Sequence, residues 1–107
     1  MSFTLHDLAA TIDARAAAAD GEASYTKKLL DKGAVHCAKK FGEEAVELVI
    51  ATVEDDRTNF INESADVLFH LLVVLKSRGV TIQDVEAALA ARTHQSGLQE
   101  KASRKSD

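Results

Sequence analysis

The chain contains 107 residues and carries a formal net charge of −4, a size that fits a single domain. No lysine or arginine run suggests nucleic-acid binding, and the apolar stretch at 67–75 is too short to span a bilayer. The single cysteine, Cys37, cannot form an internal disulfide, which fits a reducing compartment. We find no positively charged leader with an apolar core, so we expect a cytoplasmic protein without nucleic-acid or membrane partners.

Helix signals begin close to the N-terminus, in a chain that has no proline. Thr4 can cap a first helix over residues 4–18, with Asp7 near the positive end of the helix dipole. Residues 24–30 predict a short helical turn that ends near Gly33.

Three further helices are predicted along the rest of the chain. Two long ones cover residues 35–53 and 57–78, joined by a short turn near Asp55, with Gly79 in the usual C-terminal stop position. Thr81 then caps a last helix that runs to residue 92. We therefore predict an all-α antiparallel bundle of four main helices over residues 1–92, followed by a polar tail over residues 93–107.

The helix at 57–78 also bears on oligomeric state. Between residues 67 and 75 only His70 is polar, so this helix is apolar nearly all round, as expected of a helix buried on every side. Four short helices can hardly cover it in one small monomer. The pattern therefore predicts a homodimer with this helix near the interface.

Acidic residues lie at matched positions on the two long helices. Glu44 and Glu47 are three residues apart on the first, and Glu63 and Asp66 are three apart on the second, so each pair shares one helix face. In an antiparallel pair that turns near Asp55, Glu47 lies level with Glu63 and Glu44 with Asp66. The two levels are about 4.5 Å apart at the rise of an α-helix.

Four carboxylates in such a seam repel one another, and a hard divalent cation relieves the repulsion. Mg²⁺ and also Mn²⁺ prefer oxygen ligands, so the spacing favours a Mg²⁺ site. The alternative is a solvated charged face in which Lys39 pairs with Glu43, which explains Glu43 well but explains Glu63 and Asp66 poorly. Zinc and di-iron sites fit less well, because the histidines are scattered and the cysteine is single.

The acidic residues belong to a recognisable pattern. The segments GEEAVE at 42–47 and ESAD at 63–66 resemble the EExxE…ExxD signature of the MazG-type all-α nucleotide pyrophosphatases. The flanking segments SYTKKL at 24–29, AKKFGEEA at 38–45, DVLFHLLV at 66–73 and SGLQEKASR at 96–104 resemble the phosphoribosyl-ATP pyrophosphatase family more specifically. The resemblance covers nearly the whole chain.

This resemblance implies hydrolysis of phosphoribosyl-ATP to phosphoribosyl-AMP and pyrophosphate, the second step of histidine biosynthesis. Mg²⁺ would neutralise phosphate charge and activate a water for attack on phosphorus. The implied metal ligands are Glu44, Glu47, Glu63 and Asp66, and with Glu43, an outer ligand or a base, they form the catalytic set. The implied substrate contacts are Lys40, Lys28, Thr26, His70 and Arg104.

Three of these substrate contacts also have an ordinary structural interpretation. Lys28 can be an exposed lysine, His70 a hydrogen-bonded core histidine, and Arg104 part of a solvated tail. For the whole chain, the nearest rival is a MazG-type house-cleaning enzyme that cleaves noncanonical nucleoside triphosphates. A non-catalytic helical dimerisation module is the rival from a different class.

Overall fold

A computed structural model describes residues 2–18 and 24–93 of the chain. The described part is all-α, as predicted, and none of its helices combines the length and apolar character needed to cross a membrane. The predicted tail from residue 94 onward, with Arg104, lies outside the described residues. The helices are α1 (Leu5–Ala16), α2 (Tyr25–Asp31), α3 (Ala34–Val53), α4 (Arg57–Ser77) and α5 (Ile82–Arg92).

Short polar side chains determine where α1 and α5 begin. The Thr4 hydroxyl accepts a hydrogen bond from the Asp7 backbone N–H at 3.1 Å, and the Asp7 carboxylate accepts one from the Thr4 N–H at 2.9 Å. Thr81 and Asp84 form the same reciprocal pair at 3.1 and 3.0 Å. These capping boxes pair backbone donors that the first turn leaves free, and they confirm both predicted helix starts.

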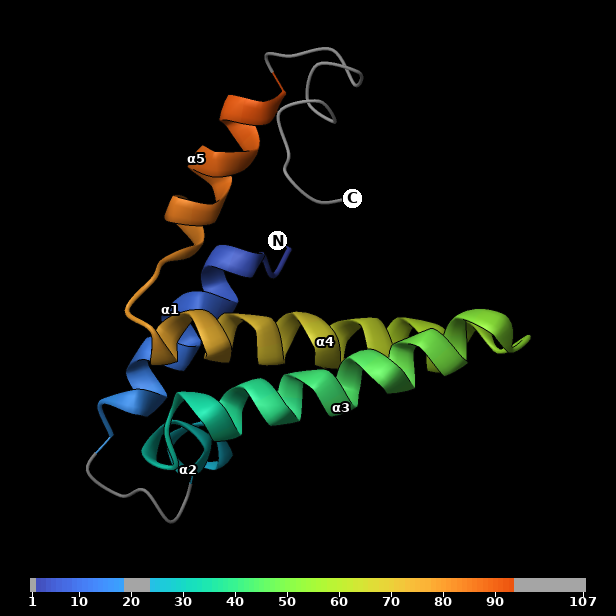
Figure 1. Ribbon diagram of the computed structural model, residues 1–107, viewed down its shortest axis with the longest axis horizontal. Coiled ribbons are helices and arrows are strands. Elements are labelled where there is room, and N and C mark those ends of the chain that lie inside the picture. Colours follow the sequence, from blue (N-terminus) through green and yellow to red (C-terminus); the bar gives the residue numbers. More distant parts are fainter. Residues whose placement is uncertain (1, 19–23, 94–107) are drawn as a thin grey trace.

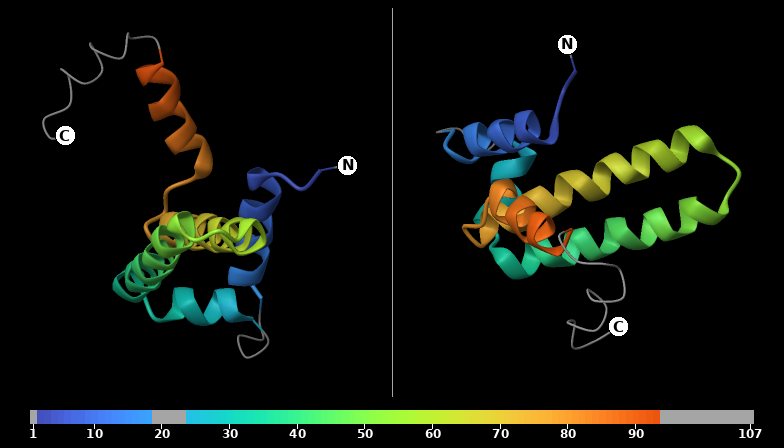
Figure 2. Two further views of the ribbon diagram at one scale, coloured as in Figure 1. Left: turned by 90° about the vertical axis from the view of Figure 1, so that its right-hand side faces the viewer. Right: turned by 90° about the horizontal axis from the view of Figure 1, so that it is seen from above.

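The two long helices form an antiparallel hairpin, joined through residues 54–56 (Figure 1). The short helices α1 and α2 lie at the end of the hairpin remote from this turn, and α5 projects away from it (Figure 2). Gly79, at φ 69°, lies in the turn after α4, in a conformation that glycine adopts without strain.

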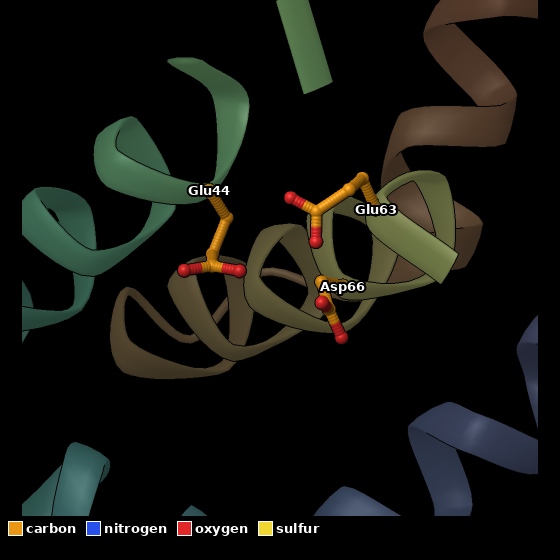
Figure 3. Close-up of side chains that lie close together, drawn as sticks. All are labelled: Glu44, Glu63 and Asp66. Atoms are coloured by element: carbon orange, nitrogen blue, oxygen red, sulfur yellow. The ribbon is translucent and has the colours of Figure 1, made fainter. Parts of the chain in front are cut away.

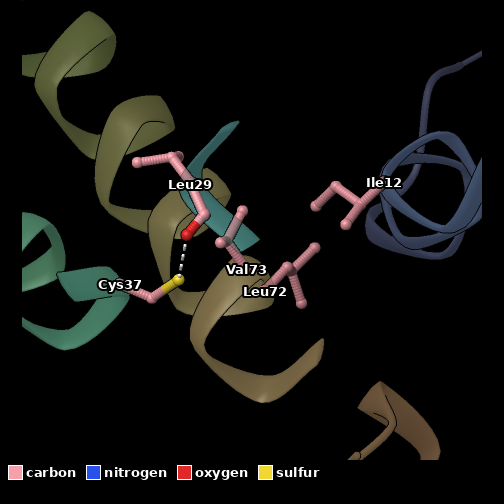
Figure 4. Close-up of a cluster of buried hydrophobic side chains, with 5 residues drawn as sticks. All are labelled: Ile12, Leu29, Cys37, Leu72 and Val73. Atoms are coloured by element: carbon pink, nitrogen blue, oxygen red, sulfur yellow. Dashed lines mark hydrogen bonds between the residues drawn. The ribbon is translucent and has the colours of Figure 1, made fainter. Parts of the chain in front are cut away.

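The core lies where α1, α2, α3 and α4 meet (Figure 4). Its buried members come from all four of these helices: Ile12, Leu29, Cys37, Leu72 and Val73. The Cys37 thiol donates a hydrogen bond to the Leu29 carbonyl at 3.2 Å, and burial raises the pKa of the thiol. Cys37 is therefore a packing residue joining α2 to α3, as expected for a small helical side chain.

The outer half of the hairpin, next to the 54–56 turn, is uncovered by the rest of the described chain (Figure 2). Apolar side chains on both helices are exposed there, and we call them the outer apolar stripe. On α3 the members of the stripe recur at helical spacing, and further members lie on α4. Its members are Val46, Val49, Ile50, Val53, Phe60, Ile61 and Leu68, each at least 40% exposed.

Candidate metal centre and adjoining basic pocket

Three carboxylates meet between the long helices (Figure 3). Glu44 approaches from α3, and Glu63 and Asp66 approach from α4, with one oxygen of each lying within 4.8 Å of the others. The antiparallel hairpin produces this meeting, because Glu44 and Asp66 are equally far from the turn that joins the helices. Three of the four predicted metal ligands are thus brought together in one cluster.

The carboxylate cluster is electrostatically unfavourable by itself. Partial burial raises the pKa of Glu63, and the neighbouring charges of Asp66, Glu47 and Glu44 raise it further. Oxygen donors without an accompanying thiolate or imidazole are the set that a hard divalent cation prefers. The arrangement therefore fits a divalent metal ion bound between α3 and α4.

Glu47, the fourth predicted ligand, lies outside this cluster. It is exposed on α3. Its charge nevertheless contributes to the raised pKa of Glu63, so it lies near enough to affect that carboxyl. Helix pairing explains this proximity, because Glu47 and Glu63 flank the hairpin turn at equal distance.

Glu43 faces a cation. Its carboxylate accepts a hydrogen bond from the Lys40 ammonium at 3.1 Å. This pairing lowers the pKa of Glu43 and raises the pKa of Lys40. Glu43 is therefore linked to Lys40 along α3, while its neighbour Glu44 is turned toward α4.

His70 is buried beside the cluster, with only 6% of its surface exposed. Its ring packs edge-on against Phe69 at 5.1 Å and Tyr25 at 6.2 Å between ring centroids. Burial lowers the pKa of His70, although Glu44 and Asp66 act in the opposite direction. Its Nδ1 atom has no hydrogen-bond partner among the described residues, so this polar atom remains available to a ligand.

A second feature, the basic pocket, opens between α2 and α3 beside these groups. It has a volume of about 250 Å³. Its lining residues, mostly cationic or aromatic, are Tyr25, Lys28, Leu29, Lys32, His36 and Lys40.

Sequence analysis predicted two members of the basic pocket, Lys28 and Lys40, and missed Lys32 and His36. The recurrence of His36, Lys40 and Glu44 at intervals of four residues is the signal that could have identified His36. Thr26, also predicted, is 1% exposed and does not line the pocket.

A larger cavity of about 350 Å³ lies elsewhere, between α1 and the connection from α4 to α5. An ion pair at 3.1 Å joins Asp13 to Lys76 at its wall. None of the predicted catalytic or substrate residues lines it. The candidate catalytic site therefore consists of the carboxylate cluster and the basic pocket.

Comparisons with known proteins converge on one family. The family pattern described as phosphoribosyl-ATP pyrophosphohydrolase matches residues 5–93. The chain is 75% identical to a Rhodopseudomonas palustris protein named phosphoribosyl-ATP pyrophosphatase 1, over 98% of this chain and 97% of the relative. It is 71% identical to a Bradyrhizobium diazoefficiens protein of the same name, over 96% of each chain. A Ruegeria pomeroyi protein named phosphoribosyl-ATP pyrophosphatase is 56% identical over 94% of each chain.

Proposed function

The chain belongs to the phosphoribosyl-ATP pyrophosphohydrolase family, and from this membership we propose that it hydrolyses phosphoribosyl-ATP to phosphoribosyl-AMP and pyrophosphate. This is the second step of histidine biosynthesis. The observation that supports the proposal most directly is the meeting of Glu44, Glu63 and Asp66 between α3 and α4. Three carboxylates from two helices provide the oxygen ligands that metal-assisted phosphoryl chemistry requires.

The proposed cofactor is Mg²⁺, with Mn²⁺ as an alternative of similar ligand preference. Glu44, Glu63 and Asp66 would hold it, and the exposed Glu47 would join them from α3. When bound, the ion supplies charge neutralisation on the phosphates and a lower pKa for a coordinated water.

The remaining residues position the substrate and its outer phosphates. Lys40 and Lys28 lie in the basic pocket and would contact phosphate oxygens. Because Lys40 lowers the pKa of Glu43, Glu43 is better suited to orienting Lys40 than to accepting a proton. The unpartnered Nδ1 of His70 would hydrogen-bond to the substrate or to a ligating carboxylate. Thr26 would support α2 from the interior, and Arg104 is a proposed phosphate contact from the tail.

We also propose that the protein acts as a cytoplasmic homodimer. The outer apolar stripe supports the dimer, because a second copy would cover apolar side chains that the described chain leaves in water. A symmetric pair of hairpins would bury the stripe of each copy against the other.

Incubation of the purified protein with phosphoribosyl-ATP and Mg²⁺, with the products separated by chromatography, tests the activity. We expect phosphoribosyl-AMP and pyrophosphate in equal amounts, and no turnover when EDTA replaces Mg²⁺. Orthophosphate together with phosphoribosyl-ADP as first products would contradict the proposal. Faster cleavage of free noncanonical nucleoside triphosphates would favour a house-cleaning enzyme instead.

A further inference from the structure

We propose that the basic pocket holds the β- and γ-phosphates of the triphosphate, and hence the pyrophosphate that leaves. Lys32 and His36 would contribute two contacts beyond those of Lys28 and Lys40. This inference rests on the proposed function and assigns one end of the substrate to one place in the fold.

Charge is the first argument. Every formally charged residue in the lining is a lysine, in a chain whose net charge is −4. Lys28 and Lys32 form no ion pair with any residue of 2–18 or 24–93, whereas Lys40 is paired with Glu43. Pyrophosphate carries several negative charges on neighbouring oxygens, so a site for it needs several cations close together. The pocket supplies such a group of cations beside a cluster of acids.

Position along α3 is the second argument. His36, Lys40 and Glu44 follow one another at four-residue intervals on one face of α3. Each interval spans about 6 Å at the rise of an α-helix, a short step between neighbouring sites. A triphosphate with its α-phosphate at the carboxylates would therefore extend its outer phosphates along this face toward α2.

The substrate has a second candidate anion, the phosphate of the phosphoribosyl group. It is separated from the α-phosphate by two ribose rings and the adenine base, on the other side of the bond that breaks. The basic pocket adjoins the carboxylates, because Lys40, which lines it, lies one helical turn before Glu44 on α3. An adjoining pocket suits the neighbouring phosphates better than the distant one.

The assignment has a chemical consequence. Water adds to the α-phosphorus and gives up a proton to the surrounding solvent, the bond from that phosphorus to the α,β-bridging oxygen breaks, and its electron pair stays on the pyrophosphate. Negative charge therefore grows on the leaving group during the reaction. Lysines already placed around those oxygens stabilise this charge without reorganising, which lowers the barrier. Lys32 and His36 are accordingly assigned to leaving-group stabilisation.

Product inhibition tests the assignment, because the two products carry the two ends of the substrate. Inhibition constants for pyrophosphate and for phosphoribosyl-AMP are measured with Mg²⁺ for the wild-type protein and for Lys32→Gln. We expect the pyrophosphate constant to rise roughly tenfold, the effect of losing one charge-assisted hydrogen bond, while the phosphoribosyl-AMP constant stays unchanged. Lys32→Arg should restore most of the pyrophosphate affinity.

Lys27→Gln is the matched control, because Lys27 lies on α2, which Lys32 directly follows, but pairs with Asp31 at 3.3 Å and does not line the pocket. It should leave both constants unchanged. Calorimetric titration of wild type and Lys32→Gln with pyrophosphate and Mg²⁺ needs no turnover, so it tests the pocket even if phosphoribosyl-ATP proves not to be the substrate. Weaker phosphoribosyl-AMP inhibition with unchanged pyrophosphate inhibition would overturn the assignment, and so would unchanged constants for both.

Discussion

Glu63 combines burial with like-charged neighbours, and both raise its carboxyl pKa. A carboxyl whose pKa is higher in the folded than in the unfolded state destabilises the fold when it is ionised. The effect is absent below the unfolded-state pKa of about 4.3 and complete above the folded-state value. Wherever Glu63 is ionised and no metal is bound, it therefore opposes folding.

We accordingly predict that Glu63→Gln, in EDTA at pH 7, melts at the same temperature as the wild type or slightly higher. The difference should shrink as the pH falls through the raised folded-state pKa of Glu63 and be gone below about pH 4, since wild-type Glu63 is then protonated too. Thermal melting followed by circular dichroism across this pH range measures it. Glu54→Gln, in the exposed connection after α3, is the control and should show no such trend. A clear loss of stability at pH 7 would contradict the repulsion.

Once Mg²⁺ is added, the same carboxylates should stabilise the fold instead of destabilising it. We predict that Mg²⁺ raises the melting temperature of the wild type but not of Asp66→Asn, because the substitution removes a ligand charge while keeping the shape. Turnover of this variant should fall by roughly 10²-fold or more. Glu47→Gln should behave likewise if Glu47 joins the site. If Mg²⁺ raised the melting temperature of all three proteins equally, the four-carboxylate site would be disproved. If a variant lost this rise in melting temperature but kept full turnover, the carboxylates would bind the metal without taking part in catalysis.

Among the secondary-structure elements, those set by local chemistry were predictable from the sequence. Thr4 with Asp7 and Thr81 with Asp84 identified helix starts, and the spacing of acids about Asp55 identified the pairing of α3 with α4. The seven-residue α2 was expected as a short helical turn and is confirmed as a helix. Helix periodicity and capping depend on near neighbours in sequence, which one chain displays directly.

Features that depend on how helices dock were not predictable in the same way. Lys32, the residue that follows α2, lies one helical turn after Lys28, but both face Lys40 across the basic pocket only because α2 packs beside α3. Glu47 is level with Glu63 by residue count, yet its carboxylate lies outside the cluster, because residue count gives the level along the hairpin but not the direction of a side chain. The projection of α5 from the hairpin also depends on tertiary contacts rather than on its own sequence pattern (Figure 1).

Replacing either of two glycines by alanine should change the stability of the protein, in opposite directions. Gly42 lies within α3 and Gly79 in the turn after α4, and an added Cβ would meet no atom within 4 Å at either position. Gly42→Ala should therefore stabilise the protein by about 0.5–1 kcal/mol, because glycine weakens a helix interior. Gly79→Ala should destabilise it by about 1 kcal/mol, because φ 69° strains any side chain. Urea unfolding of both variants measures these changes, and the same sign for both would refute the explanation.

At the scale of the whole molecule, the outer apolar stripe predicts a dimer. Sedimentation should give a mass near twice the 11.5 kDa chain at micromolar concentration. Val49, 67% exposed on α3, would be buried in that dimer, so Val49→Glu should yield a folded monomer. Ala14→Glu adds the same charge at an exposed position on α1, at the end of the hairpin remote from the stripe, and should remain dimeric. A stable wild-type monomer would contradict the prediction.

The same two helices carry both the carboxylates and the outer apolar stripe, so the proposed metal binding and the proposed self-association would be thermodynamically linked. A second copy that steadied α3 against α4 would also steady the distances among Glu44, Glu63 and Asp66. Linkage is reciprocal, so whatever factor the dimer adds to Mg²⁺ affinity, Mg²⁺ adds to dimer affinity. Dilution alone would then release the cation, and the enzyme's own concentration would act as an effector of its catalytic centre.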